Sequence, residues 1–578
     1  MVFSRDAKSA ALLAVALVVL PLATSEFTAY QIALYLIYGI AAQGVAVCWG
    51  RLGFLPLGHA LFFGLGAYLF GGGLKAAEDD ALWYAALPLA VAAPALLAYV
   101  IARLVFARSS RSGPYFSLIT LALTMLGFLA AQQWSSLTGG FNGMANVPDI
   151  PGTSRYETLY WLVAACAVVS TLVLAMLAAR PIGVIWEAVA QNEERLQLLG
   201  YATDRIKANA FAFSALLASL AGALFAAHQG IVTPQAMSFL LSTEFVIWAA
   251  VGGKASALGP LLGATVVGYA SAELREQFLY WEVVVAAVFI AVVLFLPHGV
   301  AGLLKRKADA RHAKDVPAPA APGDGAAAGP VSLALDGVQT GQAGVTILDG
   351  LSLSLRGPGI RCVIGPNGAG KTSSFNVITG RLPLLGGGVR LNDHDIGGWA
   401  AWRVARRGIG RKMQVPSVFP DLTVRENLGL AVWAGRASGL DTLRLSALGW
   451  HTPLLDDILK EFEALQARLD ARAGTLAQGH RQALELAMTL LPEPRLVLLD
   501  EPCAGLSPAE THQMIDAIKS LVHQIGAAAL LIEHDITAVD AMGGDVYVLH
   551  QGRLLAKGSL AEIQGSAEVR AVYAGGRK

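Results

Sequence analysis

The feature that most constrains this chain is a change of composition near residue 304. Before this point the sequence is dominated by long apolar segments, and after it the composition is that of a soluble domain. Over all 578 residues the mean hydropathy is +0.53 and only 15% of residues are charged, which is too apolar for an ordinary soluble protein. Because domains average roughly 150 residues, we expect at least two domains, the first of them in a membrane.

The first half contains segments long enough to cross a bilayer. A membrane helix needs about 20 apolar residues, because its backbone polar groups must be paired within the helix. The third segment is rich in glycine and the eighth and ninth are short, so we predict eight to ten transmembrane helices. The segments lie near residues 9–24, 29–48, 54–74, 82–106, 115–133, 158–179, 207–227, 237–252, 257–273 and 281–297.

The first segment has an alternative interpretation. Arg5 and Lys8 precede an apolar run from Ser9 to Ala23, as in a cleaved signal peptide. Another long apolar segment follows at once, which favours a retained first helix.

The distribution of cations gives the orientation, because short cytoplasmic loops collect Lys and Arg. With the N-terminus inside, only Lys75, Arg155 and Arg275 fall on the outer side. The residues predicted on the cytoplasmic side are Arg5, Lys8, Arg51, Arg103, Arg108, Arg111, Arg180, Arg195, Arg205, Lys207, Lys254, Lys305, Arg306 and Lys307. The asymmetry places the C-terminal half in the cytoplasm.

Charge and cysteine usage exclude several other classes. A net charge of +1 gives no large field, which argues against nucleic acid as a partner. The cysteines, Cys48, Cys166, Cys362 and Cys503, have no CxxC spacing and indicate neither a disulfide framework nor a zinc site. An Ala/Pro/Gly stretch from Ala308 to Pro330 is predicted to be a flexible linker.

A phosphate-binding loop follows the linker. Strand-like runs at 331–335 and 360–364 precede GPNGAGKTS, in which Gly365, Gly370, Lys371 and Thr372 have the spacing of a phosphate loop between a strand and a helix. Backbone N–H groups of such a loop and the helix N-terminus favour phosphate oxygens. Lys371 is predicted to reach the β- and γ-phosphates, and the Thr372 hydroxyl to hold Mg²⁺. The predicted nucleotide contacts here are Gly365, Pro366, Asn367, Gly368, Ala369, Gly370, Lys371, Thr372 and Ser373.

Two further apolar strands end in ionisable residues. RLVLLDEP is typical of a buried parallel strand that delivers carboxylates at its C-terminal end. Asp500 is predicted to assist Mg²⁺ and Glu501 to polarise the attacking water. The run AAALLIEHD presents His534, which is predicted to contact the γ-phosphate. A structural surface histidine is the alternative for His534.

A glycine-containing loop precedes a helix in LAQGHRQALELAMTLL, residues 476–491, and its N-terminus also suits an anion. LAQGHRQ resembles the LSGGQ-type signature loop of the ATP-binding cassette family. GPNGAGKT, Gln414 in GRKMQVP, LLDEP, AGLSP and His534 follow the family order. The resemblance implies an α/β P-loop ATPase over 331–578 with a helical subdomain at about 421–487. It gives Gln414 catalytic and Mg²⁺-binding roles, and places Leu476, Ala477, Gln478, Gly479 and His480 on ATP held by a second such domain.

The sequence departs from that family pattern in three places. Ala477 lacks the hydroxyl of the usual serine, and His480 replaces the usual glutamine. No aromatic residue or histidine lies between Val331 and Ser374 to stack on adenine, so Val345 or a neighbour is expected to substitute. These departures weaken individual contacts, while the phosphate and Mg²⁺ groups are intact.

The membrane half resembles permeases of the branched-chain amino acid uptake family over nearly all of residues 30–304. The resemblance lies in WGRLGFLPLGHALFFGLGAY, GPYFSLITLALT, LTGGFNG and STEFVIWAAVGG. GPYFSLIT and GRKMQVPSVFPDLTVRENL look closest to the urea and short-amide branch, with branched-chain amino acids as the alternative solute.

Three other features of the membrane half carry expectations. Residues 186–201 form an amphipathic segment suited to docking on another domain. The resemblance makes this segment the coupling helix that contacts a groove near Gln414, and a solvated loop is the alternative. His59 and Glu244 lie inside membrane segments and are predicted either to line the solute path or to lock helix packing. The glycines at 64, 66, 71, 72 and 73 are expected to serve close helix packing.

Together these observations predict a membrane domain over 1–305, a linker over 306–330 and an ATPase over 331–578. The resemblance implies ATP-driven import of a small polar solute into a bacterium or archaeon across the plasma membrane, with ATP and Mg²⁺ as cofactors. It also implies a separate extracytoplasmic binding protein and a second permease and ATPase chain, or a homodimer. An exporter is the less favoured alternative, because exporters of this layout have six long helices.

Overall fold

The computed structural model describes residues 5–77, 83–106, 113–277, 280–296, 299–303, 313–320, 331–342 and 344–575. Residue contacts divide the chain into two compact units. Unit 1 comprises Met1–Ala190 and Asp204–Asp309, and unit 2 comprises Gln191–Thr203 and Ala310–Lys578. The short segment Gln191–Thr203, which the sequence assigns to the membrane half, thus belongs with the C-terminal unit.

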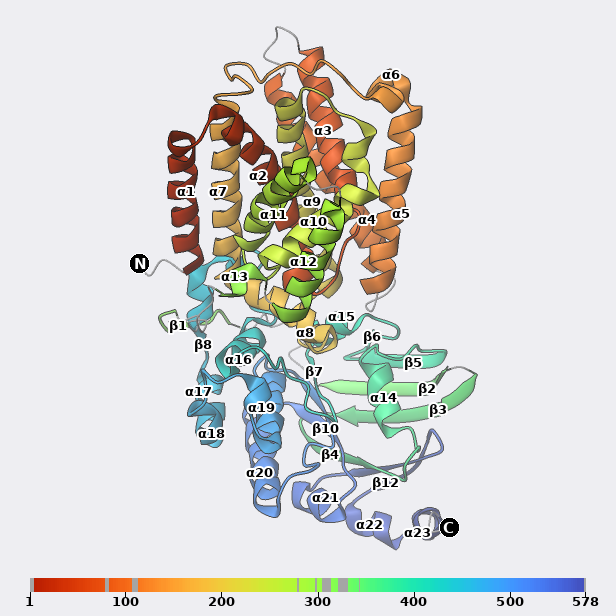
Figure 1. Cartoon of the computed structure of the whole chain (residues 1–578). Coiled ribbons are helices and arrows are strands. Elements are labelled where there is room, and N and C mark those ends of the chain that lie inside the picture. The colour runs from red at the N-terminus through yellow and green to blue at the C-terminus, as the bar shows by residue number, and fades with distance from the viewer. Residues whose placement is uncertain are drawn as a thin grey trace. The chain divides into compact units, whose positions relative to one another are not determined.

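Unit 1 is helical throughout its regular structure in the described residues, and the predicted fold class is confirmed for it. Each of the ten predicted apolar segments coincides with one helix (Figure 1). These helices are α1 (Arg5–Ala23), α2 (Glu26–Ala46), α3 (His59–Ala76), α4 (Trp83–Phe106), α5 (Gly113–Gln133), α7 (Leu159–Ala178), α9 (Thr203–Gln229), α10 (Phe239–Gly252), α11 (Gly259–Gln277) and α12 (Trp281–Phe295).

Among the described residues, five helical spans are long and apolar enough to cross a membrane: Glu26–Arg51, Tyr84–Phe106, Pro114–Gln133, Leu159–Ala178 and Thr203–Gln229. Ala10–Ala23 and Phe239–Gly252 are shorter apolar helices. A count of eight to ten spans stays a prediction. Of the cations used for the orientation, Arg108, Arg111, Lys305, Arg306 and Lys307 lie outside the described residues.

Glycines bring the helices of unit 1 close together. A Cβ atom on Gly66 of α3 would lie 2.2 Å from the carbonyl oxygen of Ser219 on α9. On Gly64 it would lie 2.2 Å from Cγ of Met237, and on Gly73 2.4 Å from Cβ of Ala86. The predicted packing role is confirmed for these three, since only a residue without Cβ permits such an approach.

Buried polar groups join the same helices. His59 at the start of α3 hydrogen-bonds through Nε2 to the Ser214 hydroxyl of α9, and is completely buried. Gln43 of α2 donates from Nε2 to Thr171 Oγ1 at 2.9 Å and to the carbonyl oxygen of Ala257 at 2.8 Å. His59 therefore contributes to helix packing. Glu244 is half-buried on α10, and its role stays a prediction.

Unit 2 contains a six-stranded sheet in the order β12-β11-β4-β10-β9-β7, in which only β12 is antiparallel to its neighbour. Every residue of β9 and β10 is buried, as in parallel strands covered on both faces. The strands are β4 (Gly359–Ile364), β7 (Ile409–Lys412), β9 (Leu496–Asp500), β10 (Ala528–Ile532), β11 (Val546–His550) and β12 (Arg553–Gly558). Helices α14 (Lys371–Ile378), α20 (Pro508–Gln524), α21 (Ile536–Met542), α22 (Leu560–Gly565) and α23 (Ala567–Gly575) belong to the same unit.

A second, antiparallel sheet has the order β3-β2-β5-β6 and comprises β2 (Ser332–Gln342), β3 (Val345–Arg356), β5 (Gly386–Leu391) and β6 (His394–Asp395). Its apolar residues share a core with the six-stranded sheet, in which Leu333, Phe375, Leu498 and Leu530 are almost fully buried. This α/β architecture confirms the predicted fold class of the C-terminal half.

Helices α16 (Val424–Trp433), α17 (Pro453–Glu461), α18 (Glu463–Gln466) and α19 (Gln478–Leu490) occupy the region predicted as a helical subdomain. A capping box between Thr423 and Glu426 begins α16, which satisfies its first N–H groups. Helix α15 (Ala401–Arg406) precedes β7.

Part of the predicted linker has structure. Val316–Pro317 forms β1, which pairs in parallel with β8 (Trp450–His451), and the amide of Ala318 donates to the carbonyl oxygen of His451 at 2.8 Å. The composition predicts a flexible stretch because it lacks a core-forming pattern. Backbone hydrogen bonds need no particular side chains, which is why residues 313–320 differ from that prediction.

Candidate active site

Four segments of the predicted site leave the six-stranded sheet at one edge. The register pairs Val363 of β4 with Ile532 of β10, and Ile532 with Asp500 of β9. Because carboxyl ends of parallel strands meet at one edge, residues distant in sequence are brought together there. The predicted residues follow these strands: the loop 365–370 follows β4, Gln414 follows β7, Glu501 follows β9 and His534 follows β10.

The phosphate loop joins β4 directly to α14, as predicted. Gly368 and Gly370 have φ of +79° and +95°, a left-handed conformation that favours glycine. The ammonium of Lys371 donates to the carbonyl oxygens of Gly365 at 2.8 Å and Pro366 at 3.0 Å, so that it lies within the curve of the loop. Within the loop Ala369 is buried and Asn367 is exposed, and Ser373 in the first turn of α14 is half-buried.

The electrostatics of Lys371 follow from its position. Burial lowers the pKa of Lys371, and the carboxylates of Glu501 and Asp500 oppose this shift. Among the described residues, the contacts of the Lys371 ammonium are two carbonyl oxygens and no ion pair, which suits a group that binds phosphate.

The pair Thr372 and Asp500 fits a magnesium ion. Thr372 Oγ1 lies 3.4 Å from Asp500 Oδ1, and Asp500 is only 1% exposed. Burial raises the pKa of Asp500, while Arg411 and the Thr372 hydroxyl lower it. A hydroxyl and a carboxylate side by side are the hard oxygen donors that Mg²⁺ prefers. These residues therefore fit the ion.

Glu501 is held by two of the other predicted catalytic residues, Gln414 and His534. Gln414 donates from Nε2 to Glu501 Oε2 at 3.0 Å, and His534 Nε2 lies 3.0 Å from Glu501 Oε1. Glu501 has φ of +45°, which is uncommon for a residue with a side chain and is typical of functional sites. The carboxylate is thereby fixed beside Asp500.

The predicted signature residues lie apart from this cluster. Ala477 caps α19 without a side-chain hydrogen bond, and Gly479 lies in the first turn of the helix rather than in the loop before it. His480 Nδ1 is 2.8 Å from a guanidinium nitrogen of Arg468. Among the described residues no hydrogen bond joins 476–480 to 365–373. The contact of this loop with ATP on a second domain stays a prediction.

Sequence reasoning missed a buried charge cluster next to the site. Glu485 on α19 and Arg411 and Lys412 on β7 are each at most 1% exposed. The signal was present, because Glu485 interrupts the apolar run in LELAM and a buried charge requires partners.

Two family models match this chain. Residues 27–294 match the model described as "Branched-chain amino acid transport system / permease component", and residues 348–504 match the model described as "ABC transporter". A "High-affinity branched-chain amino acid transport ATP-binding protein LivG" of Salmonella typhimurium is 34% identical over 248 residues, covering 42% of this chain and 97% of the relative. The chain belongs to the ATP-binding cassette (ABC) transporter family.

A second relative of this ABC transporter is the "High-affinity branched-chain amino acid transport ATP-binding protein BraF" of Pseudomonas aeruginosa. It is 33% identical over 253 residues, covering 42% of this chain and 97% of the relative. Among solved structures, a nucleotide-free ATP-binding cassette from an ABC transporter is 25% identical in sequence, with a TM-score of 0.36. The match covers 42% of this chain and 98% of the chain in that structure.

The ABC transporter thus combines two functions in one chain. Unit 1 carries the membrane-embedded permease, and unit 2 carries the ATPase that binds ATP and couples its hydrolysis to transport. The recognition of a permease fused to an ATP-binding subunit is confirmed.

Proposed function

We propose that this transporter imports a branched-chain amino acid across the plasma membrane. The observation that supports this proposal best is the match of residues 27–294 to a branched-chain amino acid permease model in the same chain as an ATPase similar to LivG and BraF. The motifs GPYFSLIT and GRKMQVPSVFPDLTVRENL favour urea or a short amide, which makes urea the competing solute.

The proposed hydrolytic roles follow from the contacts of each residue. The ammonium of Lys371 and the N–H groups of residues 365–373 bind the phosphates of ATP. Thr372 and Asp500 would hold Mg²⁺, with Gln414 as a further ligand. When bound, Mg²⁺ neutralises negative charge on the phosphate oxygens. This chain's own residues do the rest: Glu501 orients and polarises water, and Gln414 and His534 hold its carboxylate at both oxygens.

The separation of residues 476–480 from the phosphate loop supports a second ATPase domain as a partner. We propose that Leu476, Ala477, Gln478, Gly479 and His480 complete the ATP site of that partner. The partner is a second ATPase chain paired with a second permease, or a second copy of this chain. A separate extracytoplasmic binding protein delivers the solute.

Uptake into proteoliposomes tests the solute. The full chain, purified with the subunits that accompany it, is reconstituted with ATP inside and its binding protein outside. We expect radiolabelled leucine to accumulate with wild-type protein and not with Glu501→Gln. Accumulation of urea but not of leucine, isoleucine or valine would overturn the amino acid assignment, and accumulation of none of them would overturn import of either solute.

A further inference from the structure

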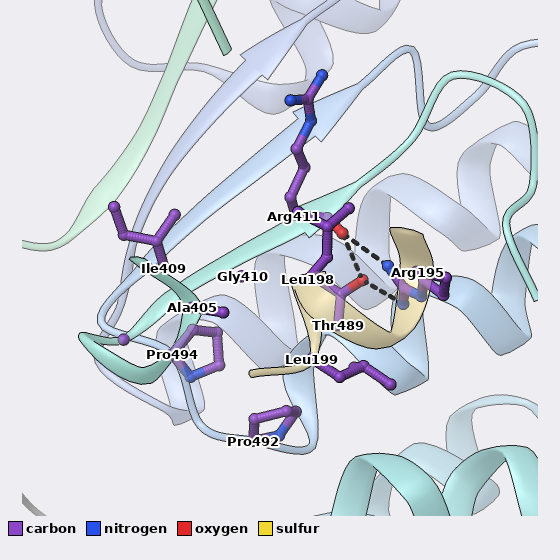
Figure 2. A pocket seen from close by; sticks show the side chains of 11 residues that line it. Arg195, Leu198, Leu199, Ala405, Ile409, Gly410, Arg411, Thr489, Pro492 and Pro494 are labelled. Carbon is purple, nitrogen blue, oxygen red and sulfur yellow. Dashed lines mark hydrogen bonds between the residues drawn. The ribbon is translucent and has the colours of Figure 1, made fainter. Parts of the chain in front are cut away.

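Arg195 is bonded to two different elements of unit 2. It comes from the segment Gln191–Thr203, and its side chain is only 1% exposed. One terminal nitrogen donates to the carbonyl oxygen of Arg411 at 2.7 Å, and the other donates to the carbonyl oxygen of Glu485 and to Thr489 Oγ1, both at 3.1 Å. Figure 2 shows the guanidinium beside Arg411 and Thr489, with dashed lines from its nitrogens to an oxygen of each.

The two elements that Arg195 joins lead to different parts of the ATPase. Arg411 lies on β7, which runs directly into the loop that carries Gln414. Glu485 and Thr489 lie on α19, whose first residues belong to the signature loop. A single guanidinium therefore fixes the start of the Gln414 loop against the signature helix.

The carboxylate of Glu485 strengthens the same link. Its Oε1 accepts the amide of Met413 at 2.9 Å and lies 3.6 Å from Arg195, while Oε2 lies 3.7 Å from the ammonium of Lys412. Burial raises the pKa of Glu485, and Lys412 and Arg195 oppose that shift. Arg411, on the same strand, reaches within 3.9 Å of Asp500 Oδ2.

Docking of the segment alone does not require a buried arginine. The neighbouring Glu194 pairs with Arg381 at a more exposed position, and Asn192 donates to Ser417 Oγ at 2.9 Å. When well-packed apolar residues replace a buried ion pair, the stability of a protein is often unchanged or even increased. The pocket of about 30 Å³ beside Arg195 is too small for a nucleotide or an amino acid, so the arginine is not a ligand site.

We propose that Arg195 and Glu485 are positioning residues for ATP hydrolysis, and that they hold the Gln414 loop and the signature helix α19 in the spacing at which hydrolysis occurs. Neither residue touches the nucleotide. Residues 191–203 are preceded by residues 181–190 of unit 1 and followed by α9 of unit 1, so the arginine makes hydrolysis depend on a segment that is covalently continuous with the permease. The proposal is independent of which solute is carried.

Steady-state ATPase measurements on the full chain in nanodiscs, with its accompanying subunits, provide the first test. We expect Arg195→Met and Glu485→Gln each to lower kcat about tenfold while KM for ATP changes by less than about twofold. The kcat of the double variant should be no lower than that of the slower single variant, because the two substitutions remove the same link. The matched control is Glu194→Gln, the adjacent residue of the same segment, which should keep wild-type kcat.

Hydrogen exchange of the nucleotide-free protein provides a readout that does not depend on activity. In Arg195→Met, amides of residues 411–414 and 478–485 should exchange at least about tenfold faster, and in Glu194→Gln they should not. If Arg195→Met does not fold, Arg195→Lys retains a buried cation with fewer donors and should show the same pattern more weakly. Any of three results would overturn the proposal. Arg195→Met could keep the wild-type kcat and exchange rates, or its effect could be confined to KM for ATP. The decreases in kcat of the two single variants could also multiply in the double variant.

Discussion

Gln414 and Glu501, 87 residues apart in the sequence, are joined by a hydrogen bond of 3.0 Å from Nε2 of the amide to Oε2 of the carboxylate. His534 contacts the other carboxylate oxygen at 3.0 Å. Each of the three follows a different parallel strand of the core sheet, so the sheet register determines how they meet. The carboxylate is thus oriented by side chains of the protein itself.

Replacing Glu501 by Gln should abolish hydrolysis while preserving nucleotide binding. The amide keeps the shape of the side chain but cannot polarise water, and loss of a general base costs about 10²–10⁴-fold in rate. The measurement is phosphate release by the full chain, together with binding of a fluorescent ATP analogue. As a control, Asp349→Asn removes an exposed carboxylate paired with Arg553 and should leave both unchanged. Hydrolysis at the wild-type rate by Glu501→Gln would refute this role.

Much of this site was predictable because its residues are specified locally. The turns at Gly368 and Gly370 need left-handed backbone, strand β10 is an unbroken apolar run, and strand β9 is apolar up to its last residue, Asp500. The ten apolar helices of unit 1 that match the predicted segments followed similarly from segment length and hydropathy. In each case neighbouring residues carry the whole signal.

The remaining features depend on contacts that no local pattern encodes. Arg195 reaches Glu485, 290 residues later, and a lone arginine in an amphipathic segment does not reveal its partner. Helix α8 (Pro181–Leu198) also has non-helical backbone at Asn192, which divides the segment that the sequence predicts as one helix. Asn192 accepts the Arg195 amide at 3.0 Å and caps the turn that follows, an effect that depends on the docked arrangement.

Gly66 and Gly72 lie on the same helix and should respond differently to alanine. A Cβ at Gly66 would lie 2.2 Å from the carbonyl oxygen of Ser219, and overpacking of this kind costs about 1–3 kcal/mol. At Gly72 the nearest atom is Met144 Cε at 3.6 Å, so Gly72→Ala should be neutral or stabilise by up to about 1 kcal/mol through helix propensity. Thermal unfolding in detergent measures both. A Gly66→Ala variant as stable as Gly72→Ala would contradict the close packing of α3 on α9.

Cys503 should resist alkylation although its side chain is partly exposed. The pKa of Cys503 is raised to about 12, mainly by burial and to a smaller extent by the carboxylate of Glu533. The thiolate is the reactive form and increases with pH, so at pH 8 iodoacetamide should modify Cys503 roughly a thousandfold more slowly than an ordinary thiol. Mass spectrometry of the Cys503 peptide between pH 7 and about 10 measures the rate, with the denatured chain as reference. Glu533→Gln should accelerate the reaction, and a rate that levels off near pH 9 would contradict the prediction.

Gly449 holds the β1 strand of the linker against β8, and its replacement should release that strand. A Cβ at Gly449 would lie 1.9 Å from the carbonyl oxygen of Lys314, a distance that requires the backbone to move. The pairing is only two residues long and has few backbone hydrogen bonds to oppose the displacement. We therefore expect Gly449→Ala to increase tryptic cleavage after Lys314 about tenfold, because proteases cut segments that open locally. Gly439→Ala, where a Cβ meets no atom within 4 Å, is the matched control and should retain the wild-type cleavage rate. Equal cleavage in the two variants would show that the β1–β8 pairing does not protect this part of the linker.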